Sequence, residues 1–198
     1  MTWRPWLLWG GLAVAVTAPI VAAGMSPLLA WRQPVYIVAG FAGILALSLL
    51  ALQPLLAGRP LPGLGPRRAR VLHRVVGPAV LICVLVHVGG LWVTSPPDVI
   101  DALLLRSPTL FSVWGVLAMV ALGLAALLAA LRAWLSPTAW RLGHSALVAV
   151  AVLGTVVHAL LIEGTMEPVT KTLLCVLTVL SLAKTIYDRR AWRLLRIG

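Results

Sequence analysis

The fold is decided by the stretch at residues 72–94, which reads LHRVVGPAVLICVLVHVGGLWVT. Its single formally charged side chain is that of Arg74. An α-helix rises about 1.5 Å per residue, so about 20 consecutive apolar residues cross the hydrocarbon core of a bilayer. Because the stretch is long and apolar enough for this, we predict that it forms a transmembrane helix.

Five more apolar stretches of comparable length accompany it, and we expect turns in the short segments between them, which are rich in proline, glycine and serine, as at Ser95-Pro96-Pro97-Asp98. The five stretches lie at residues 5–24, 35–57, 109–134, 143–162 and 168–187. The first has Arg4 before it and small residues near its end, as a signal peptide does, but its apolar run is long for one. We therefore predict an all-α integral membrane protein in which residues 1–198 form a single bundle of six transmembrane helices.

The composition of the chain agrees with this prediction. Hydrophobic residues make up 61% of its 198 residues and charged residues 11%, whereas soluble proteins are roughly 45–50% apolar and about 25% charged. Six crossings take up about 120 residues and leave only short loops. We therefore expect no attached water-soluble catalytic domain, and any chemistry should take place within the bilayer or at its surfaces.

The formal charge of +11 follows the membrane topology. Such a charge in a soluble protein would suggest a nucleic acid partner, but these cations flank apolar stretches, so we expect a lipid bilayer and no nucleic acid. With the N-terminus inside, only Arg32, Arg106 and Lys171 fall on the outer side, and the positive-inside rule places both termini in the cytoplasm. The inner-side cations are Arg4, Arg59, Arg67, Arg68, Arg70, Arg74, Arg132, Arg141, Lys184, Arg189, Arg190, Arg193 and Arg196. The arginine-rich, lysine-poor composition favours a bacterium, and hence a multi-pass protein of the bacterial cytoplasmic (inner) membrane.

All four histidines belong to two of the predicted helices. His73 and His87 lie in the third, and His144 and His158 lie in the fifth. The fourteen residues within each pair correspond to nearly four helical turns and about 21 Å, so each helix presents two imidazoles on almost the same face. The fourth helix returns the chain between them, so the two histidine helices run in the same direction. His73 then shares a depth with His144, and His87 shares another with His158.

Each pair of equal depth suits the axial ligation of one metal from opposite sides. Iron in a macrocycle needs two axial groups from the protein, whereas zinc needs about four ligands, and Cys83 is the nearest further candidate. A proton relay would use acidic side chains, which the interiors of these helices lack. A single intramembrane histidine can also serve only as a hydrogen-bonding group between helices. The repeated spacing favours haem, and because no Cys-x-x-Cys-His motif is present we expect two haem b groups.

Residues near the histidines add weaker indications. Arg74 and Arg141 stand next to the inner pair and could bind haem propionates, and Arg106 and Lys171 could do so on the outer side, although topology alone also explains these cations. We expect Cys83 and Cys175 to be buried free thiols. Glycines near the histidines could admit a flat macrocycle, although small residues are also ordinary at helix contacts in membranes. These glycines are Gly77, Gly89, Gly90, Gly143 and Gly154.

Six predicted spans with histidine pairs in the third and fifth resemble the ferric reductase-like transmembrane domain superfamily. This superfamily includes NADPH oxidases, ferric-chelate reductases and the haem membrane subunit of the bacterial methionine sulfoxide reductase system (MsrQ/YedZ-like). The basic lead-ins are similar too: residues 70–74 read RVLHR and residues 140–144 read WRLGH. The resemblance implies that His73 and His144 hold an inner haem, that His87 and His158 hold an outer one, and that the chain is a membrane oxidoreductase.

The larger members of this superfamily carry a flavin- and nicotinamide-binding dehydrogenase domain after the last span. Here only residues 188–198 follow that span, and the stretch at 63–68, GLGPRR, lacks a dinucleotide-binding fingerprint. The resemblance therefore implies a stand-alone form that receives electrons from a separate cytoplasmic flavin reductase with FAD or FMN, or from quinol. The acceptor would be ferric iron, oxygen or a periplasmic protein on the outer side.

Two other functions remain open from the sequence. Quinol-oxidising cytochrome b subunits of respiratory complexes also place two histidine pairs in two parallel helices, usually the second and fourth, and they carry a Pro-Glu-Trp-Tyr motif that is absent here. The chain could instead be a non-redox membrane subunit or assembly factor in which the histidines are structural. We find no side chain placed to act as a nucleophile or general acid, so no catalytic residue is predicted.

Overall fold

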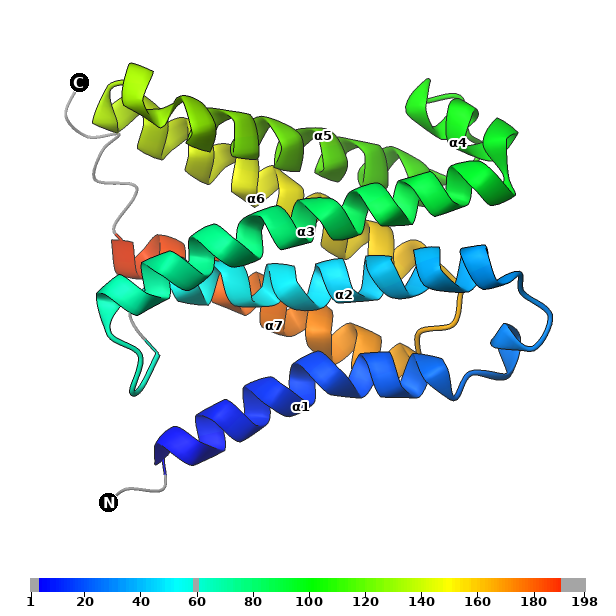
Figure 1. Ribbon diagram of the computed structural model, residues 1–198, viewed down its shortest axis with the longest axis horizontal. Helices are drawn as coiled ribbons and strands as arrows, with labels where there is room; N and C mark the ends of the chain where they lie inside the picture. The colour runs from blue at the N-terminus through cyan, green and yellow to red at the C-terminus, as the bar shows by residue number, and fades with distance from the viewer. Residues whose placement is uncertain (1–3, 59–60, 190–198) are drawn as a thin grey trace.

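The computed structural model of the protein describes residues 4–58 and 61–189. Its six long helices are α1 (Arg4–Gly24), α2 (Pro34–Ala57), α3 (Pro66–Thr94), α5 (Leu110–Ala130), α6 (Pro137–Leu161) and α7 (Pro168–Arg189) (Figure 1). Each contains a segment long and apolar enough to cross a membrane. No strand occurs within the described ranges. The prediction of an all-α bundle of six membrane-spanning helices is thus confirmed.

Proline sets the start of most of these helices. The helices α2, α3, α6 and α7 all begin at a proline, which suits a first helical position because its missing N–H would have no partner there and its φ is already helical. This explains two differences from the predicted bounds. The helix α3 begins at Pro66 rather than at residue 72, and α6 begins at Pro137 rather than at residue 143. The basic lead-ins to both histidine helices are therefore helical themselves.

Short helical elements occupy three segments between the spans. The helix α4 (Pro96–Leu103) follows α3 directly, although we predicted a turn there from its Ser-Pro-Pro-Asp sequence. Two prolines at the start of a helix are compatible with its first turn, and the Ser95 hydroxyl donates to the Asp98 carboxylate across that turn. The 3-10 turns are η1 (Pro27–Leu29) and η2 (Leu131–Trp134), and η2 replaces the predicted last turn of the fourth span.

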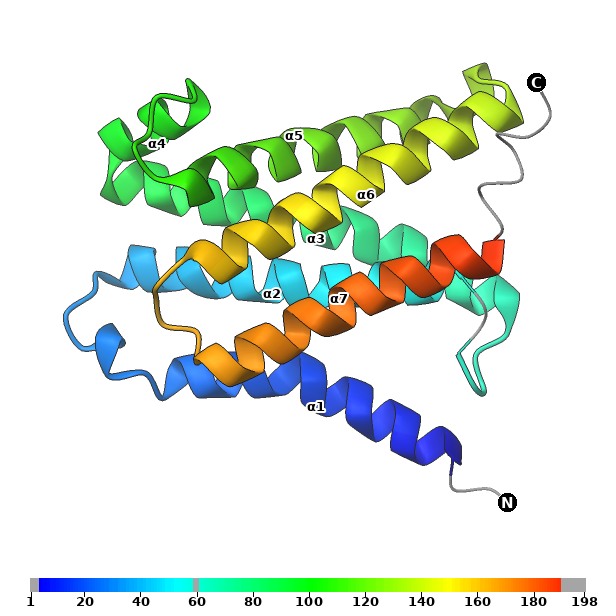
Figure 2. The same cartoon turned by 180° about the vertical axis from the view of Figure 1, so that it is seen from behind.

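Two antiparallel hairpins, α2–α3 and α5–α6, form the centre of the bundle (Figure 1). The helices α3 and α6 run in the same direction. Seen from behind, α7 crosses α2 and also packs on α6, while α1 packs on the outside against α2 and α7 (Figure 2). The helix α1 begins and α7 ends at one end of the bundle, the terminal end, and α4 lies at the opposite, distal end (Figure 1).

Small residues let the two helices of each hairpin approach closely. A Cβ atom on Gly90 of α3 would lie 2.7 Å from the Cβ of Ala39 in α2. Likewise, a Cβ on Gly154 of α6 would lie 3.1 Å from that of Ala118 in α5. Close packing of this kind stabilises helices in a bilayer, where there is little hydrophobic gain from bringing them together.

Both cysteines are free thiols, as expected. Cys175 is buried in a core where α2, α6 and α7 meet, together with Leu47, Ala51, Val156 and Leu174. Cys83 is only partly buried. It lines a shallow apolar groove where α3 meets α1 and α2.

Candidate paired-histidine site

Each of the four histidines is oriented by a backbone carbonyl on the other helix of its hairpin. The distances from Nδ1 to the carbonyl oxygen are 3.2 Å for His73 to Gln53, 2.8 Å for His87 to Ala39, 3.2 Å for His144 to Ala125 and 2.7 Å for His158 to Phe111. A carbonyl oxygen can only accept, so each Nδ1 carries the hydrogen and each Nε2 carries the lone pair. A histidine that ligates a metal is typically held this way, with its other ring nitrogen donating to a carbonyl.

The acceptors repeat the spacing of the histidines. Ala39 and Gln53 lie fourteen residues apart in α2, and Phe111 and Ala125 lie fourteen apart in α5. Since each acceptor helix is antiparallel to its histidine helix, equal spacing lets both histidines bond at the same register. The hairpins α2–α3 and α5–α6 are therefore structural repeats of one another.

The structure brings His87 and His158 together across the bundle. Their ring centroids lie 6.4 Å apart and their planes cross at 81°. Two imidazoles that ligate one metal from opposite sides, each with a metal–nitrogen bond of about 2 Å, have ring centroids about 6 Å apart. The spacing of this pair thus fits a shared axial metal such as the iron of haem.

Two glycines make room for these rings. A Cβ on Gly43 of α2 would lie 2.9 Å from Nδ1 of His87, and a Cβ on Gly115 of α5 would lie 2.7 Å from Nδ1 of His158. Each glycine follows the corresponding carbonyl acceptor, Ala39 or Phe111, by one helical turn. Any larger residue would push the ring away from its carbonyl, so glycine is required at both places.

Sequence reasoning missed these two glycines because it searched the histidine helices themselves. The glycines expected there contact other groups: a Cβ on Gly77 would meet Gln53, one on Gly143 would meet Leu128, and one on Gly89 would meet nothing within 4 Å. Gly90 and Gly154 serve the hairpin packing described above. Both glycines lie four residues after the carbonyl acceptor of the same helix, and that relation appears only once the acceptors, Ala39 and Phe111, are known.

His73 and His144 lie near the terminal end, close to the starts of α3 and α6. Both are partly buried. The buried side chain of Gln53 donates its Nε2–H to the backbone carbonyl of His73 at 3.3 Å, while the backbone carbonyl of Gln53 accepts from the His73 ring. This reciprocal contact fixes His73 against α2, and sequence reasoning gave no sign of it.

The two predicted propionate-binding arginines are exposed at the same end. Arg74 donates from Nε to the carbonyl of Arg70, one turn earlier in α3, at 3.3 Å. Arg141 is exposed in the first turn of α6, three residues before His144. Both cations therefore lie near the starts of the helices that carry His73 and His144.

Polar side chains at the distal end stabilise helix termini. The Glu167 carboxylate caps α7, accepting from the backbone N–H of Thr170 at 2.7 Å and of Val169 at 2.8 Å. These bonds to Thr170 and Val169 hold the pKa of Glu167 below its usual range. Lys171 donates from Nζ to the carbonyl of Ile162 at the end of α6, at 2.8 Å, which is a capping contact.

The donor set of the site consists of paired imidazoles. Among residues 4–58 and 61–189, no three histidine, cysteine, aspartate or glutamate side chains group closely enough to hold a metal ion. Zinc in proteins takes about four such ligands, whereas haem iron takes two and receives the others from its macrocycle. The residues present therefore fit haem.

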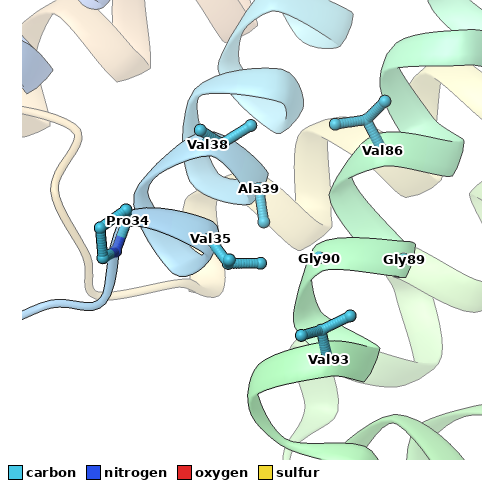
Figure 3. A pocket seen from close by; sticks show the side chains of 8 residues that line it. All are labelled: Pro34, Val35, Val38, Ala39, Val86, Gly89, Gly90 and Val93. Carbon is cyan, nitrogen blue, oxygen red and sulfur yellow. The ribbon is translucent and has the colours of Figure 1, made fainter.

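A separate apolar groove of about 420 Å³ lies between the distal ends of α2 and α3 (Figure 3). Pro34, Val35, Val38 and Ala39 face Val86, Gly89, Gly90 and Val93 across it. None of these side chains can donate or accept a hydrogen bond, and no histidine lines the groove. Such a surface suits a lipid chain, and it shares with the histidine site only Ala39, the carbonyl partner of His87.

Comparison with known families identifies the family of the chain. Residues 42–155 match the family described as ferric reductase like transmembrane component. The match covers more than half of the chain and includes His73, His87 and His144, while His158 lies just beyond its end. The chain matches no curated protein and no solved structure.

Proposed function

The chain belongs to the ferric reductase-like transmembrane family, and we propose that it is a membrane oxidoreductase that moves electrons across the bilayer with two haem b groups. The observation that carries this proposal is the close approach of His87 and His158, whose ring centroids are 6.4 Å apart and each of which is held by a backbone carbonyl. Membership of the family already indicates a membrane oxidoreductase; the haem count, the ligands and the direction are our proposal.

The four histidines would act as axial ligands in two pairs, His87 with His158 and His73 with His144. Support for the first pair comes from the ring spacing. For the second pair it comes from the repeated hairpin geometry, which gives His73 and His144 the same carbonyl-bonded tautomer. When bound, haem supplies a one-electron carrier whose reduction potential depends on its ligands and surroundings.

The protein's own residues orient these ligands and exclude water. Carbonyls of α2 and α5 fix the imidazole planes, and the apolar helices around them keep the electron path in a low dielectric. Arg74 and Arg141 would pair with the propionates of the haem at His73 and His144, since guanidinium groups bind carboxylates in bidentate fashion.

The charge distribution supports an orientation with the terminal end in the cytoplasm. Arg67, Arg68, Arg70, Arg132 and Lys184 lie toward that end within the described residues. Arg59, Arg190, Arg193 and Arg196, which strengthen the same bias in the sequence, lie outside the described residues. We propose that the protein resides in a bacterial cytoplasmic membrane with its haem at His73 and His144 on the cytoplasmic side.

The proposed donor is a cytoplasmic flavin reductase carrying FAD or FMN, or membrane quinol. The acceptor is ferric iron, oxygen or a periplasmic protein on the outer side. The alternative, a quinol-oxidising cytochrome b subunit of a larger respiratory complex, would use the same histidine pairs. The two differ in which reductant acts quickly on the isolated chain.

Electron transfer across sealed vesicles tests the proposal. The purified chain would be reconstituted into liposomes that contain ferricyanide, and dithionite or reduced FMN would be added outside. We expect the enclosed ferricyanide to be reduced much faster than in liposomes with no protein or with the His158→Ala chain. Rates equal to those of protein-free liposomes would contradict the proposal, and rapid reduction by a quinol analogue but not by reduced flavin would favour the cytochrome b alternative.

A further inference from the structure

An aromatic stack at the terminal end connects an arginine to one of the histidines. The indole of Trp140 lies nearly parallel to the imidazole of His144, with ring centroids 5.6 Å apart and planes at 14°. The guanidinium carbon of Arg132, in the turn η2, lies 4.7 Å from the centre of the same indole. Arg132, Trp140 and His144 thus form one contiguous group at the base of the α5–α6 hairpin.

The indole N–H of Trp140 has no hydrogen-bond partner although it is shielded from solvent. Leaving a buried donor unpaired costs free energy, and such a group in a native structure calls for an explanation. By contrast, the indole N–H of Trp9 donates to the carbonyl of Pro62 at 2.9 Å. The contacts of Trp140 with His144 and Arg132 are both made by the faces of its indole ring and not by its N–H. A phenylalanine at this place would keep a flat ring and remove the unpaired donor.

The ring of His144 has reason to need such a contact. Its bond to the Ala125 carbonyl is 3.2 Å long, whereas the bond of His158 to Phe111 is 2.7 Å. The position equivalent to Gly115, four residues after the acceptor Ala125, is Ala129 rather than a glycine. A parallel indole restricts rotation of the imidazole, and stacked or cation-bearing aromatic groups attract each other at these separations.

We propose that Trp140, held by Arg132, is a positioning residue that fixes the plane of the His144 imidazole and brings a positive charge close to that ligand. The inference rests on the proposed function, in which His144 is an axial ligand. Arg132 is exposed, so solvent weakens its field, but a cation close to a metal centre still favours the reduced, less positive state of that metal. The stack therefore raises the reduction potential of the haem at His73 and His144 and leaves the other haem unaffected.

Redox titration and electron paramagnetic resonance of the purified, haem-loaded chain test this. Arg132→Gln should shift the midpoint potential of one haem to a lower value and leave the second unchanged. Trp140→Leu, which removes the flat face, should move or broaden the low-spin signal of the same haem, because that signal reports the orientation of the axial imidazoles. Trp140→Phe keeps a flat ring and should restore most of the wild-type signal.

Trp134 provides the matched control. It lies in η2 with Arg132 and is 87% exposed, so Trp134→Leu should change neither haem. The proposal is overturned if Arg132→Gln leaves both potentials unchanged, if Trp140→Phe behaves like Trp140→Leu, or if both haems shift together. Should Trp140→Leu fail to fold, Arg132→Gln alone decides. A wild-type chain without haem would instead remove the proposed function itself, and this inference with it.

Discussion

The two histidine levels are built from one repeated hairpin but are held in different ways. At the His87/His158 pair the bonds from Nδ1 to the carbonyls are 2.8 and 2.7 Å, and a glycine of the neighbouring helix makes room for each ring. At the His73/His144 pair both bonds are 3.2 Å. There, side chains from the same hairpins add further contacts, Gln53 on His73 and Trp140 on His144.

The difference is that backbone groups do most to orient the rings of His87 and His158, whereas neighbouring side chains add to the orientation of His73 and His144. Carbonyls and glycines hold both rings of the His87/His158 pair, and the Phe111 ring adds an edge contact to His158 with centroids 6.0 Å apart. The geometry of this pair therefore follows mainly from helix packing. Side chains around the His73/His144 pair can change its orientation and electrostatic environment without disturbing the bundle. In the proposed topology that adjustable level faces the electron donor, where a match to the donor's potential is needed.

Removing a histidine should have the largest effect. Replacing His87 or His158 by alanine should abolish the haem of that level and spare the other, because a haem loses one of its two axial bonds. Replacing His73 or His144 should do the reverse. Redox titration of each purified variant identifies which haem remains. Four variants that all retain both haems would show that the histidines are structural.

Substitution of the ring-facing glycines should have the next largest effect. Gly43→Ala and Gly115→Ala place a Cβ less than 3 Å from a ring nitrogen. Overpacking of this kind costs about 1–3 kcal/mol, or roughly fivefold to a hundredfold in the affinity of the haem at His87 and His158. Haem transfer to apomyoglobin measures that affinity.

Each of these helices offers a matched control. Gly40 in α2 and Gly123 in α5 have no atom within 4 Å of an added Cβ, so Gly40→Ala and Gly123→Ala should retain haem as the wild type does. Equal loss in test and control variants would indicate a general effect on the helices and would refute the role given to Gly43 and Gly115.

A change at Gln53 should affect only the haem at His73 and His144, and its effect should be smaller than that of the glycine substitutions. Gln53→Met keeps the size of this buried side chain and removes the donor to the His73 carbonyl. The expected cost is about 1 kcal/mol of stability, typical of one hydrogen bond, with a changed spectrum for the haem at His73 and His144. A shift of the His87/His158 haem instead would show that the two levels are not independent.

The smallest expected effect is the pH dependence contributed by Glu167. Its carboxylate caps α7, and the bonds from Thr170 and Val169 lower its pKa from the usual 4.5. A lowered folded-state pKa stabilises the protein above the unfolded value, and this stability is lost as the pH falls through the folded value. The melting temperature of Glu167→Gln should lie below that of the wild type at pH 7, and the gap should close in acid. A gap that stays constant with pH would contradict the assignment.

The six spans and the relative depths of the four histidines could be predicted from the sequence. Apolar length predicted the six spans, which the structure has. The spacing of the four histidines predicted two levels because helix periodicity is regular, and the structure brings His87 next to His158. The predicted starts of α3 and α6 were too late, and α4 was predicted as a turn. In each case a proline was interpreted as a sign of a turn, although proline also favours the first position of a helix.

The contacts of the rings could not be derived from the sequence. Gly43, Gly115 and Gln53 act across a hairpin, and only the register of α2 against α3 and of α5 against α6 shows which residues face a histidine. Trp140 lies four residues before His144 in the sequence. Whether its ring stacks on the imidazole depends on the side-chain rotamer, and on Arg132 reaching it from η2.

The number of b haems per chain tests the central claim most directly. It can be measured on the detergent-purified wild-type protein, expressed with ample haem supply, from the dithionite-reduced minus oxidised spectrum and from extracted haem. We predict about two haem b groups per chain, one for each histidine pair. One haem would restrict the account to a single level, and a chain that binds none would contradict it.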